Sequence, residues 1–286
     1  MISNSVLPDQ SEYLQIITNI AGFPKSLYFS GNLPKNRVKT VSIVGTRKPT
    51  DYGTEFAYKF AYELAKRGIV IVSGLAYGID AIAHKAALDA GGTTIAILPS
   101  GLNRIYPSGN AKLADRIVEN GGCLLTKYEP DSHPYKSSFV QRSQIVSGIA
   151  DGVLVIEAGA KSGTMHTAEF ARRQGRVVMA LPGNINSVMS EGCNNLIKKG
   201  AVAITETADI LSAIGFKKLI QTTLPVGSNP QEQIILKLIT SGVNQTEHLQ
   251  KQSSLSAAEL NQALTMLEIS GQIKSISAGK WVTGNL

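Results

Sequence analysis

Small residues and hydroxyl residues recur where the apolar runs of this chain end. These residues are Gly45, Ser73, Gly74, Gly101, Ser162, Gly163 and Thr164. Glycine lets a backbone approach an anion closely, hydroxyls donate hydrogen bonds, and helix N-termini offer free N–H groups. One such turn would be weak evidence, because α/β loops need glycine for turning. Several turns at the same edge of a sheet predict an anion-binding rim.

Cations and aromatic residues accompany these turns. The cations near strand ends or helix starts are Arg47, Lys48, Arg142, Lys161, Lys198 and Lys199. A second group has the pattern of a solvated helix face and comprises Arg172, Arg173, Arg176, Lys217 and Lys218. Tyr77, Tyr106 and Phe139 are aromatic residues that can stack exposed bases beside the cations, and each also fits a core position.

Two pairs of titratable residues are candidates for acid–base chemistry. Asp80 and His84 are four residues apart on one predicted helix face, and His166 and Glu169 are three apart. No nucleophile accompanies either pair, so the favoured interpretation is structural, with Asp80 capping its helix and His84 bonded to it. No cluster of His, Cys and carboxylates has metal-ligand spacing. We therefore expect no catalytic residue, no metal and no cofactor.

The phosphate-binding motifs of common nucleotide enzymes are missing. No Gly-x-Gly-x-x-Gly follows the first apolar run, and there is no Gly-x-x-x-x-Gly-Lys followed by Ser or Thr. This argues against a dinucleotide-dependent enzyme and against a P-loop ATPase.

The elements that must position these residues alternate regularly. Apolar runs typical of buried parallel strands cover residues 41–44, 69–72, 94–98, 123–125, 153–156, 177–181 and 201–204. Amphipathic stretches lie between them, one with Phe56, Phe60 and Leu64 on a single face and others at about 79–90, 110–120, 139–147 and 164–174. The alternation predicts an α/β fold with a doubly wound, mostly parallel sheet over residues 41–215.

The two ends of the chain have different patterns. Residues 1–40 form an N-terminal extension, of which residues 24–28 should pack on the sheet edge. Residues 216–230 are rich in Pro, Gly and Ser and predict a linker. Residues 231–286 predict a small C-terminal winged-helix domain, with helices near 234–239, 246–250 and 256–269 followed by a hairpin. Its candidate recognition helix, residues 256–263, has no Arg or Lys, which favours protein contact or packing over duplex binding.

Composition sets the class of the protein and of its partner. The chain has 286 residues, 43% of them hydrophobic, and a net charge of +7. Four Lys and four Glu after Val226 cancel, so the whole excess belongs to the first 225 residues and points to a polyanionic partner. Two isolated cysteines, no export signal and no membrane-length apolar run predict a cytoplasmic protein without membrane contact.

In chain order, these motifs resemble the DNA processing protein A family (DprA, also called Smf). The segments that carry the resemblance are Val44-Gly45-Thr46-Arg47, Tyr52-Gly53, Val72-Ser73-Gly74-Leu75-Ala76, Gly78-Ile79-Asp80, Ala83-His84, Ala87-Leu88, residues 94–98, Gly101-Leu102, Tyr106-Pro107, Phe139, Arg142, Glu157-Ala158, Ser162-Gly163-Thr164, Arg176, Pro182-Gly183, Asn195-Leu196-Ile197 and Gly200-Ala201. They cover about residues 24–212 and, more loosely, the winged-helix tail.

The resemblance implies an extended Rossmann-like domain that binds single-stranded DNA in a basic pocket, usually as a homodimer. It also implies a protein that protects incoming DNA and helps load the recombinase RecA in natural transformation. The pocket would use Arg47, Arg142 and one of Lys198 or Lys199, with Phe139 beside them. The full set of expected DNA-binding residues is Gly45, Arg47, Lys48, Ser73, Gly74, Gly101, Phe139, Arg142, Ser162, Gly163, Thr164, Lys198 and Lys199. The chain departs from the family's usual Arg-Asn-Arg at Arg142-Ser143-Gln144.

Two other classes of function remain as alternatives. The segment from Ser162 to Glu169 faintly resembles the Gly-Gly-x-Gly-Thr-x-x-Glu motif of nucleoside-monophosphate phosphoribohydrolases, but Glu169 stands two places too far along. A helix turns about 100° per residue, so this displacement would turn the carboxylate away from the expected face. A pure interaction scaffold would leave the basic rim unexplained.

Overall fold

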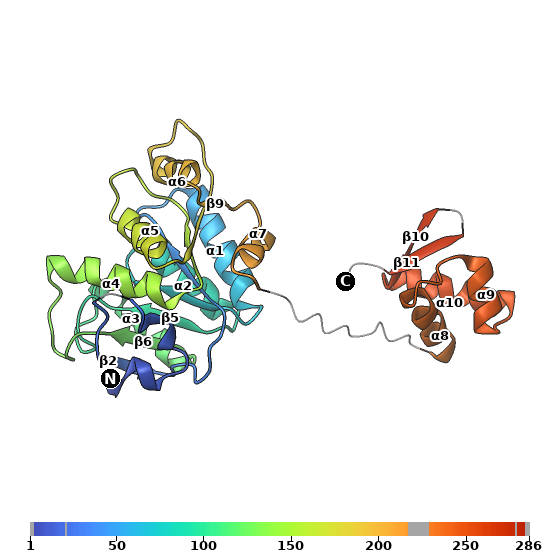
Figure 1. Cartoon of the computed structure of the whole chain (residues 1–286), viewed down its shortest axis with the longest axis horizontal. Helices are drawn as coiled ribbons and strands as arrows, with labels where there is room; N and C mark the ends of the chain where they lie inside the picture. Colours follow the sequence, from blue (N-terminus) through green and yellow to red (C-terminus); the bar gives the residue numbers. More distant parts are fainter. Residues whose placement is uncertain (1–2, 21, 217–228, 278, 284–286) are drawn as a thin grey trace. The chain divides into compact units, whose positions relative to one another are not determined.

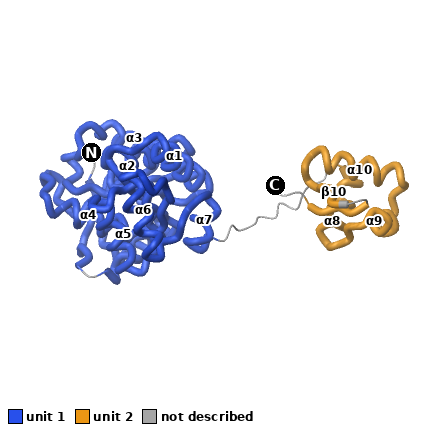
Figure 2. The backbone as a smooth tube through the Cα atoms, turned by 90° about the horizontal axis from the view of Figure 1, so that it is seen from above, with its two compact units in different colours: residues 1–216 blue, residues 217–286 orange. Residues whose placement is uncertain are grey.

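The chain folds into two units, which we call the sheet unit (residues 1–216) and the winged-helix unit (residues 217–286) (Figures 1 and 2). The computed structural model describes residues 3–20, 22–216, 229–277 and 279–283. Most of the expected linker, together with Lys217 and Lys218, lies outside the described residues.

The described residues of the sheet unit form a sheet of nine strands in the order β1-β2-β6-β5-β4-β3-β7-β8-β9. The strands are β1 (Asn4–Val6), β2 (Leu27–Gly31), β3 (Thr40–Val44), β4 (Val70–Ser73), β5 (Thr94–Ile97), β6 (Cys123–Thr126), β7 (Gly152–Val155), β8 (Val177–Ala180) and β9 (Val202–Ala203). All neighbouring pairs from β6 to β9 are parallel. The seven predicted strands are all present, each within one residue of its expected bounds.

Helices cover both faces of the sheet. One face carries α4 (Lys136–Ile149), α5 (Thr164–Arg173) and α6 (Val188–Lys198), and the other carries α1 (Asp51–Ala65), α2 (Ile79–Asp89), α3 (Ala111–Glu119) and α7 (Thr207–Ala213). Short 3₁₀ turns occur at Pro8–Gln10, Gln15–Ile17 and Ser108–Asn110. Successive strand residues face opposite cores, as in β7, where Val153 and Val155 pack on one side and Leu154 on the other. Burial on both faces explains the continuous apolar runs and confirms the doubly wound α/β fold.

The order of the strands creates a switch point beside β3. The chain runs from β3 outward through β4 and β5 to β6, and then returns to β7 on the other side of β3. The carboxyl ends of β3 and β7 therefore leave the sheet side by side and lead to helices on opposite faces. Ligands of doubly wound sheets bind in the crevice that forms at this place.

The N-terminal residues extend the same sheet. β2 pairs antiparallel with β6, and β1 pairs antiparallel with β2. Tyr13, Leu14 and Ile17 are fully buried in the core on the face that carries α4. The expectation that residues 24–28 pack on the sheet edge takes a more specific form, because Leu27 and Tyr28 belong to β2, a strand of the sheet that lies between β6 and the edge strand β1.

The described residues of the winged-helix unit form three helices and a hairpin, which confirms the predicted winged helix. They are α8 (Pro230–Thr240), α9 (Thr246–Ser253), α10 (Ala257–Ile269), β10 (Ile273–Ser277) and β11 (Lys280–Thr283). Ser256 begins α10 with a reciprocal capping box to Glu259. Ile235, Leu249 and Leu260 form part of its own small core. None of the described helices has the length and apolar character needed to cross a membrane.

Candidate functional site

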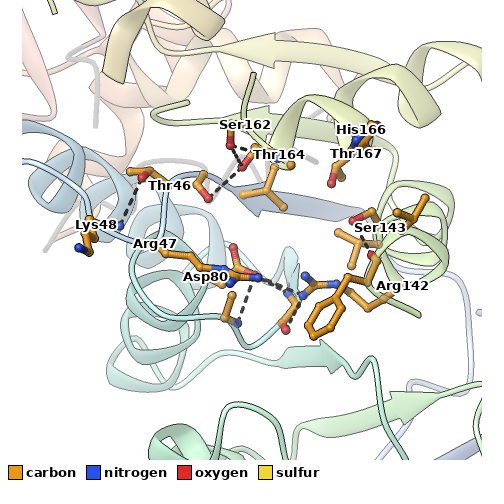
Figure 3. Close-up of a pocket in the computed structure, with 18 of the residues that line it drawn as sticks. Thr46, Arg47, Lys48, Asp80, Arg142, Ser143, Ser162, Thr164, His166 and Thr167 are labelled. Atoms are coloured by element: carbon orange, nitrogen blue, oxygen red, sulfur yellow. Dashed lines mark hydrogen bonds and ion pairs between the residues drawn. The ribbon is translucent and has the colours of Figure 1, made fainter. Parts of the chain in front are cut away.

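A pocket of about 470 Å³ opens at the switch point, and we call it the switch-point pocket. Its walls come from the segments that follow β3 and β4, from α4, and from the start of α5 (Figure 3). Its polar and glycine lining residues include Gly45, Thr46, Arg47, Lys48, Gly74, Asp80, Arg142, Ser143, Ser162, Gly163, Thr164, His166 and Thr167. Most of the residues expected to bind DNA thus meet in one place.

Hydrogen bonds to the backbone and to the buried carboxylate of Glu157 fix the segment after β3. Thr46 N donates to the Glu157 carbonyl at 2.7 Å. Gly45 packs closely against Ile79, because a Cβ on Gly45 would lie 2.6 Å from Ile79 Cγ1. Glu157 is 2% exposed and accepts from Thr50 N at 2.9 Å and from the Thr50 hydroxyl at 2.6 Å. Because Thr50 caps α1, these bonds hold the intervening residues Arg47 and Lys48 against the pocket.

The segment after β4 forms the opposite wall in a rigid conformation. Leu75 is fully buried with φ +58°, in the left-handed region that side chains rarely adopt. Asn110 stabilises this conformation, because its Nδ2 donates to the Leu75 carbonyl at 2.9 Å and to the Ala76 carbonyl at 3.2 Å. Asp80 Oδ2 accepts from Gly74 N at 3.1 Å and from Ala76 N at 3.3 Å. Both sides of the turn are thus hydrogen-bonded.

Arg142 reaches this wall from α4. Its Nη1 lies 3.5 Å from Asp80 Oδ2 and donates to the Gly74 carbonyl (Figure 3). A Cβ on Gly74 would overlap the guanidinium, so a side chain there would have to displace Arg142 from this position. Burial raises the pKa of Asp80, against the opposing effect of Arg142, and burial likewise lowers the pKa of Arg142. The pair is therefore a largely desolvated ion pair within the pocket wall.

The expected contact between Asp80 and His84 is wrong. Asp80 points to the loop amides of Gly74 and Ala76 and to Arg142. His84 is fully buried, and its Nδ1 lies 2.7 Å from Thr94 Oγ1 of β5. Burial lowers the pKa of His84 to about 3. The spacing of four residues placed both on one helix, but each side chain found a partner on a different strand or loop.

The start of α5 closes the pocket on the β7 side. Thr164 Oγ1 donates to the Gly45 carbonyl at 3.0 Å, which ties α5 to the segment after β3. Ser162 Oγ donates to Thr164 Oγ1 at 3.1 Å and accepts from Thr164 N at 3.2 Å. The positive end of the α5 dipole is thereby directed at a wall that also carries Arg47 and Lys48. This combination suits an anion.

Aromatic rings lie at the rim of the same pocket. The rings of Tyr106 and Phe139 meet edge to face with centroids 5.3 Å apart, and the Arg47 guanidinium lies 6.0 Å from the Phe139 centroid. Tyr77 is 49% and Tyr106 41% exposed, so both rings are accessible. Together with Pro99 they line a small hollow that shares Arg47, Phe139 and Arg142 with the main pocket.

Four of the residues expected to bind DNA lie outside the pocket lining. Ser73 is fully buried and its hydroxyl donates to the Ile43 carbonyl at 2.6 Å. A Cβ on Gly101 would contact the backbone of Glu129 and Pro130, so this glycine serves close packing. Lys198 and Lys199 end α6, and Lys199 lines a separate groove.

The pocket lining also contains polar residues that are not among the predicted DNA-binding residues. Thr46, Ser143 and Thr167 stand beside or near residues that were expected there. His166 lines the pocket too, whereas its spacing in the sequence predicts only a pair with Glu169. The helical period could have identified Thr167, which follows Thr164 by three residues and faces the same side of α5.

Arg172, Arg173 and Arg176 have partners within the sheet unit. Glu169 accepts from Arg172 at 2.9 Å and from Arg173 at 2.8 Å, and these bonds lower the pKa of Glu169 to about 2. Glu169 lies outside the lining of the switch-point pocket. Arg176 is not on a solvated face, because its Nη2 donates to the carbonyls of Ile16 and Gly148.

Comparisons with known proteins agree with this architecture. Residues 4–215 match the family model of the DNA recombination-mediator protein A, and residues 221–279 match the DprA winged helix domain. Protein Smf of Escherichia coli is 35% identical over 288 residues, which cover 97% of this chain and 77% of that protein. The chain spans 64% of two curated relatives from Mycobacterium tuberculosis.

Two solved structures are similar in both sequence and fold. The crystal structure of DNA processing protein A from Streptococcus pneumoniae has a TM-score of 0.67 and 38% identity, covering 74% of this chain and 73% of that one. DNA processing protein A from Helicobacter pylori has a TM-score of 0.64 and 35% identity, covering 73% and 94%. The latter structure was reported for its single-stranded DNA binding mode.

Proposed function

The chain belongs to the DNA recombination-mediator protein A family, and on that premise we propose that its sheet unit binds single-stranded DNA in the switch-point pocket without reacting with it. The observation that carries this proposal is the convergence of Arg47, Lys48 and the start of α5 on one pocket at the switch point. The H. pylori relative, whose single-stranded DNA binding mode has been described, supports the same ligand class.

The backbone of the DNA is the part that this pocket suits. Arg47 and Lys48 provide charge, while Ser162, Gly163 and Thr164 provide hydroxyls and backbone close to a helix N-terminus. The net charge of +7 lies wholly in the first 225 residues, which contain the pocket. Contacts with phosphates dominate the affinity for nucleic acids and carry no sequence information. We therefore propose binding with little dependence on sequence.

The aromatic rim favours a single strand over a duplex. In a single strand the faces of the bases are available to Tyr77, Tyr106 and Phe139, and each stacked base contributes about 1–3 kcal/mol. A duplex hides these faces within its own stack. We expect the candidate recognition helix α10 of the winged-helix unit to add no phosphate contact to a duplex, because it contains no Arg or Lys.

A binding role accounts for the site better than hydrolysis does. A phosphoribohydrolase would need a carboxylate free to act in the pocket, but Glu169 is bonded to Arg172 and Arg173 outside its lining. Asp80, which does line the pocket, is paired with Arg142. We expect no ribose phosphate to be released when the protein is incubated with AMP, and its release at a catalytic rate would favour the enzyme.

The cellular role follows from the family. Its name describes a mediator of recombination, so we propose that the protein protects incoming DNA in the cytoplasm and helps load RecA onto it in natural transformation. We further propose that it acts as a homodimer. Stimulation of RecA filament formation on single-stranded DNA would test the first point, and sedimentation of the free protein would test the second.

The direct test of the proposed function is binding to matched oligonucleotides. Fluorescence anisotropy should give tighter binding to a labelled single strand than to the duplex formed from the same strand and its complement. The same salt and pH must be used for both, because phosphate contacts make the affinity strongly dependent on salt. Equal or tighter duplex binding would overturn the proposal.

A further inference from the structure

Arg142 differs from the other cations of the switch-point pocket, because it is held by a carboxylate. The side chains of Arg142 and Asp80 are 11% and 7% exposed, and Arg142 Nη1 lies 3.5 Å from Asp80 Oδ2. The same Oδ2 atom accepts the amides of Gly74 and Ala76. Asp80 Oδ2 thus connects the backbone of the loop after β4 with the Arg142 side chain, which comes from α4.

We propose that Asp80 is a positioning residue for DNA binding, which orients the Arg142 guanidinium and the 74–76 backbone toward the phosphate. This inference rests on the proposed function, because it concerns how the same pocket holds single-stranded DNA. Asp80 acts through Arg142 and the loop and has no need to touch the ligand itself.

The contacts explain why a carboxylate is needed here. A buried arginine without a counter-charge is strongly destabilised, so without Asp80 the guanidinium would turn toward water and leave the Gly74 carbonyl. The described contacts of Arg142 all use Nη1, and its Nε is buried with no hydrogen-bond partner among the described residues. Nη2, which makes no hydrogen bond or ion pair among the described residues, is therefore left over for a phosphate oxygen, in an orientation that Asp80 fixes.

The close fit at Gly74 makes the arrangement rigid. The guanidinium occupies the space where any side chain at position 74 would begin, so it packs directly on the backbone. Leu75 is held in its left-handed conformation on the other side by Asn110. A rotation of the guanidinium would break its hydrogen bond to the Gly74 carbonyl, which lies two residues before Ala76 at the pocket surface.

A double-mutant cycle in the full chain tests the inference. Asp80→Asn keeps the shape and an acceptor oxygen but removes the charge, and it is compared with Arg142→Ala and with the double variant. Anisotropy with a labelled oligothymidylate measures the dissociation constants. We expect Asp80→Asn to weaken binding roughly tenfold, within the coupling that neighbouring bonded groups show. The loss of affinity in the double variant should be smaller than the product of the losses in the two single variants.

Asp89→Asn is the matched control. Asp89 ends the same helix α2, is exposed, and pairs with Arg116 at 3.6 Å outside the pocket lining. The substitution makes the same change in net charge and should leave binding as in the unmodified chain. Thermal unfolding of every variant establishes the temperature range in which all of them are folded, and binding is compared within that range.

The inference would be overturned if the losses of affinity of the two single variants multiplied in the double variant. It would also be overturned if Asp80→Asn bound the oligonucleotide as tightly as the unmodified chain. If Asp80→Asn fails to fold, Arg142→Lys decides instead, since it keeps the charge but lacks the planar fork. Weakened binding by Arg142→Lys supports positioning, and unchanged binding refutes it. Failure of the unmodified chain to bind the oligonucleotide would refute the proposed function itself, which is a different result.

Discussion

Replacing Arg47 by alanine removes the guanidinium that lines both hollows of the site and lies 6.0 Å from the centre of the Phe139 ring. A hydrogen bond to a charged group contributes about 1.5–3 kcal/mol. The loss of one such bond to phosphate corresponds to a weakening of roughly 10- to 150-fold. Arg47 has no ion-pair partner among the described residues, so no carboxylate is left exposed by its removal.

The salt dependence separates a phosphate contact from other causes. Each phosphate contact on a single strand contributes about 0.7 to the slope of log affinity against log salt concentration. Over a fourfold increase in salt, the unmodified protein should therefore weaken about 2.6-fold more than Arg47→Ala does. Arg67→Ala is the control, because Arg67 carries the same charge just after α1 but pairs with Glu63 away from the pocket. Anisotropy titrations at several salt concentrations give both slopes.

An unchanged slope in Arg47→Ala would show that Arg47 does not contact phosphate and that the backbone is held elsewhere. An equal loss of affinity in Arg67→Ala would assign the effect to overall charge. Either result would refute the reasoning from the pocket.

Two further predictions concern the tail and His84. Deleting residues 226–286 should change the single-strand affinity by less than about threefold, because that segment has no net charge and phosphate contacts dominate the affinity for DNA. A hundredfold loss of affinity in a folded, monodisperse truncated protein would show that the winged-helix unit contacts the DNA. His84 should make stability fall in acid, because its pKa is lowered from 6.5 to about 3 and the unfolded chain takes up the proton first. As the pH falls from 6.5 toward 3, denaturant unfolding should lose up to about 1.4 kcal/mol per pH unit more than in His84→Gln, and equal slopes would contradict this.

The main sheet and the location of the pocket could be predicted because their signals are local. Strands buried on both faces appear as continuous apolar runs, as in β7. Parallel strands all end at the same edge, so the glycines and hydroxyls after β3 and β7 had to meet once the sheet formed. The positions of Gly45, Gly74 and Ser162 in the pocket follow from that rule.

Features that depend on partners far along the chain could not be predicted. Gly74 and Arg142 stand 68 residues apart, and no spacing rule connects them. The rule for residues four apart gave His84 as the partner of Asp80, but tertiary contacts prevailed. The strand β2 could not be predicted, because its partner strand β6 lies much later in the sequence.

Helix α6 was also missed, because its sequence weakens the helical signal. It contains Gly192 and two asparagines, which have low helix propensity. Gly192 is required by packing, since a Cβ there would lie 2.5 Å from the Ala158 carbonyl. Tertiary packing therefore supplied what the local sequence lacked.

Both margins of the nine-stranded sheet are short, and this limits how copies of the protein can associate. The sheet ends in β1, with three residues, on one side and in β9, with two residues, on the other. Edge strands of this length present few unpaired backbone N–H and C=O groups, which protects a sheet from adding foreign strands and from aggregation. Two copies that assemble through the sheet unit would accordingly depend on side-chain contacts more than on pairing of their edge strands.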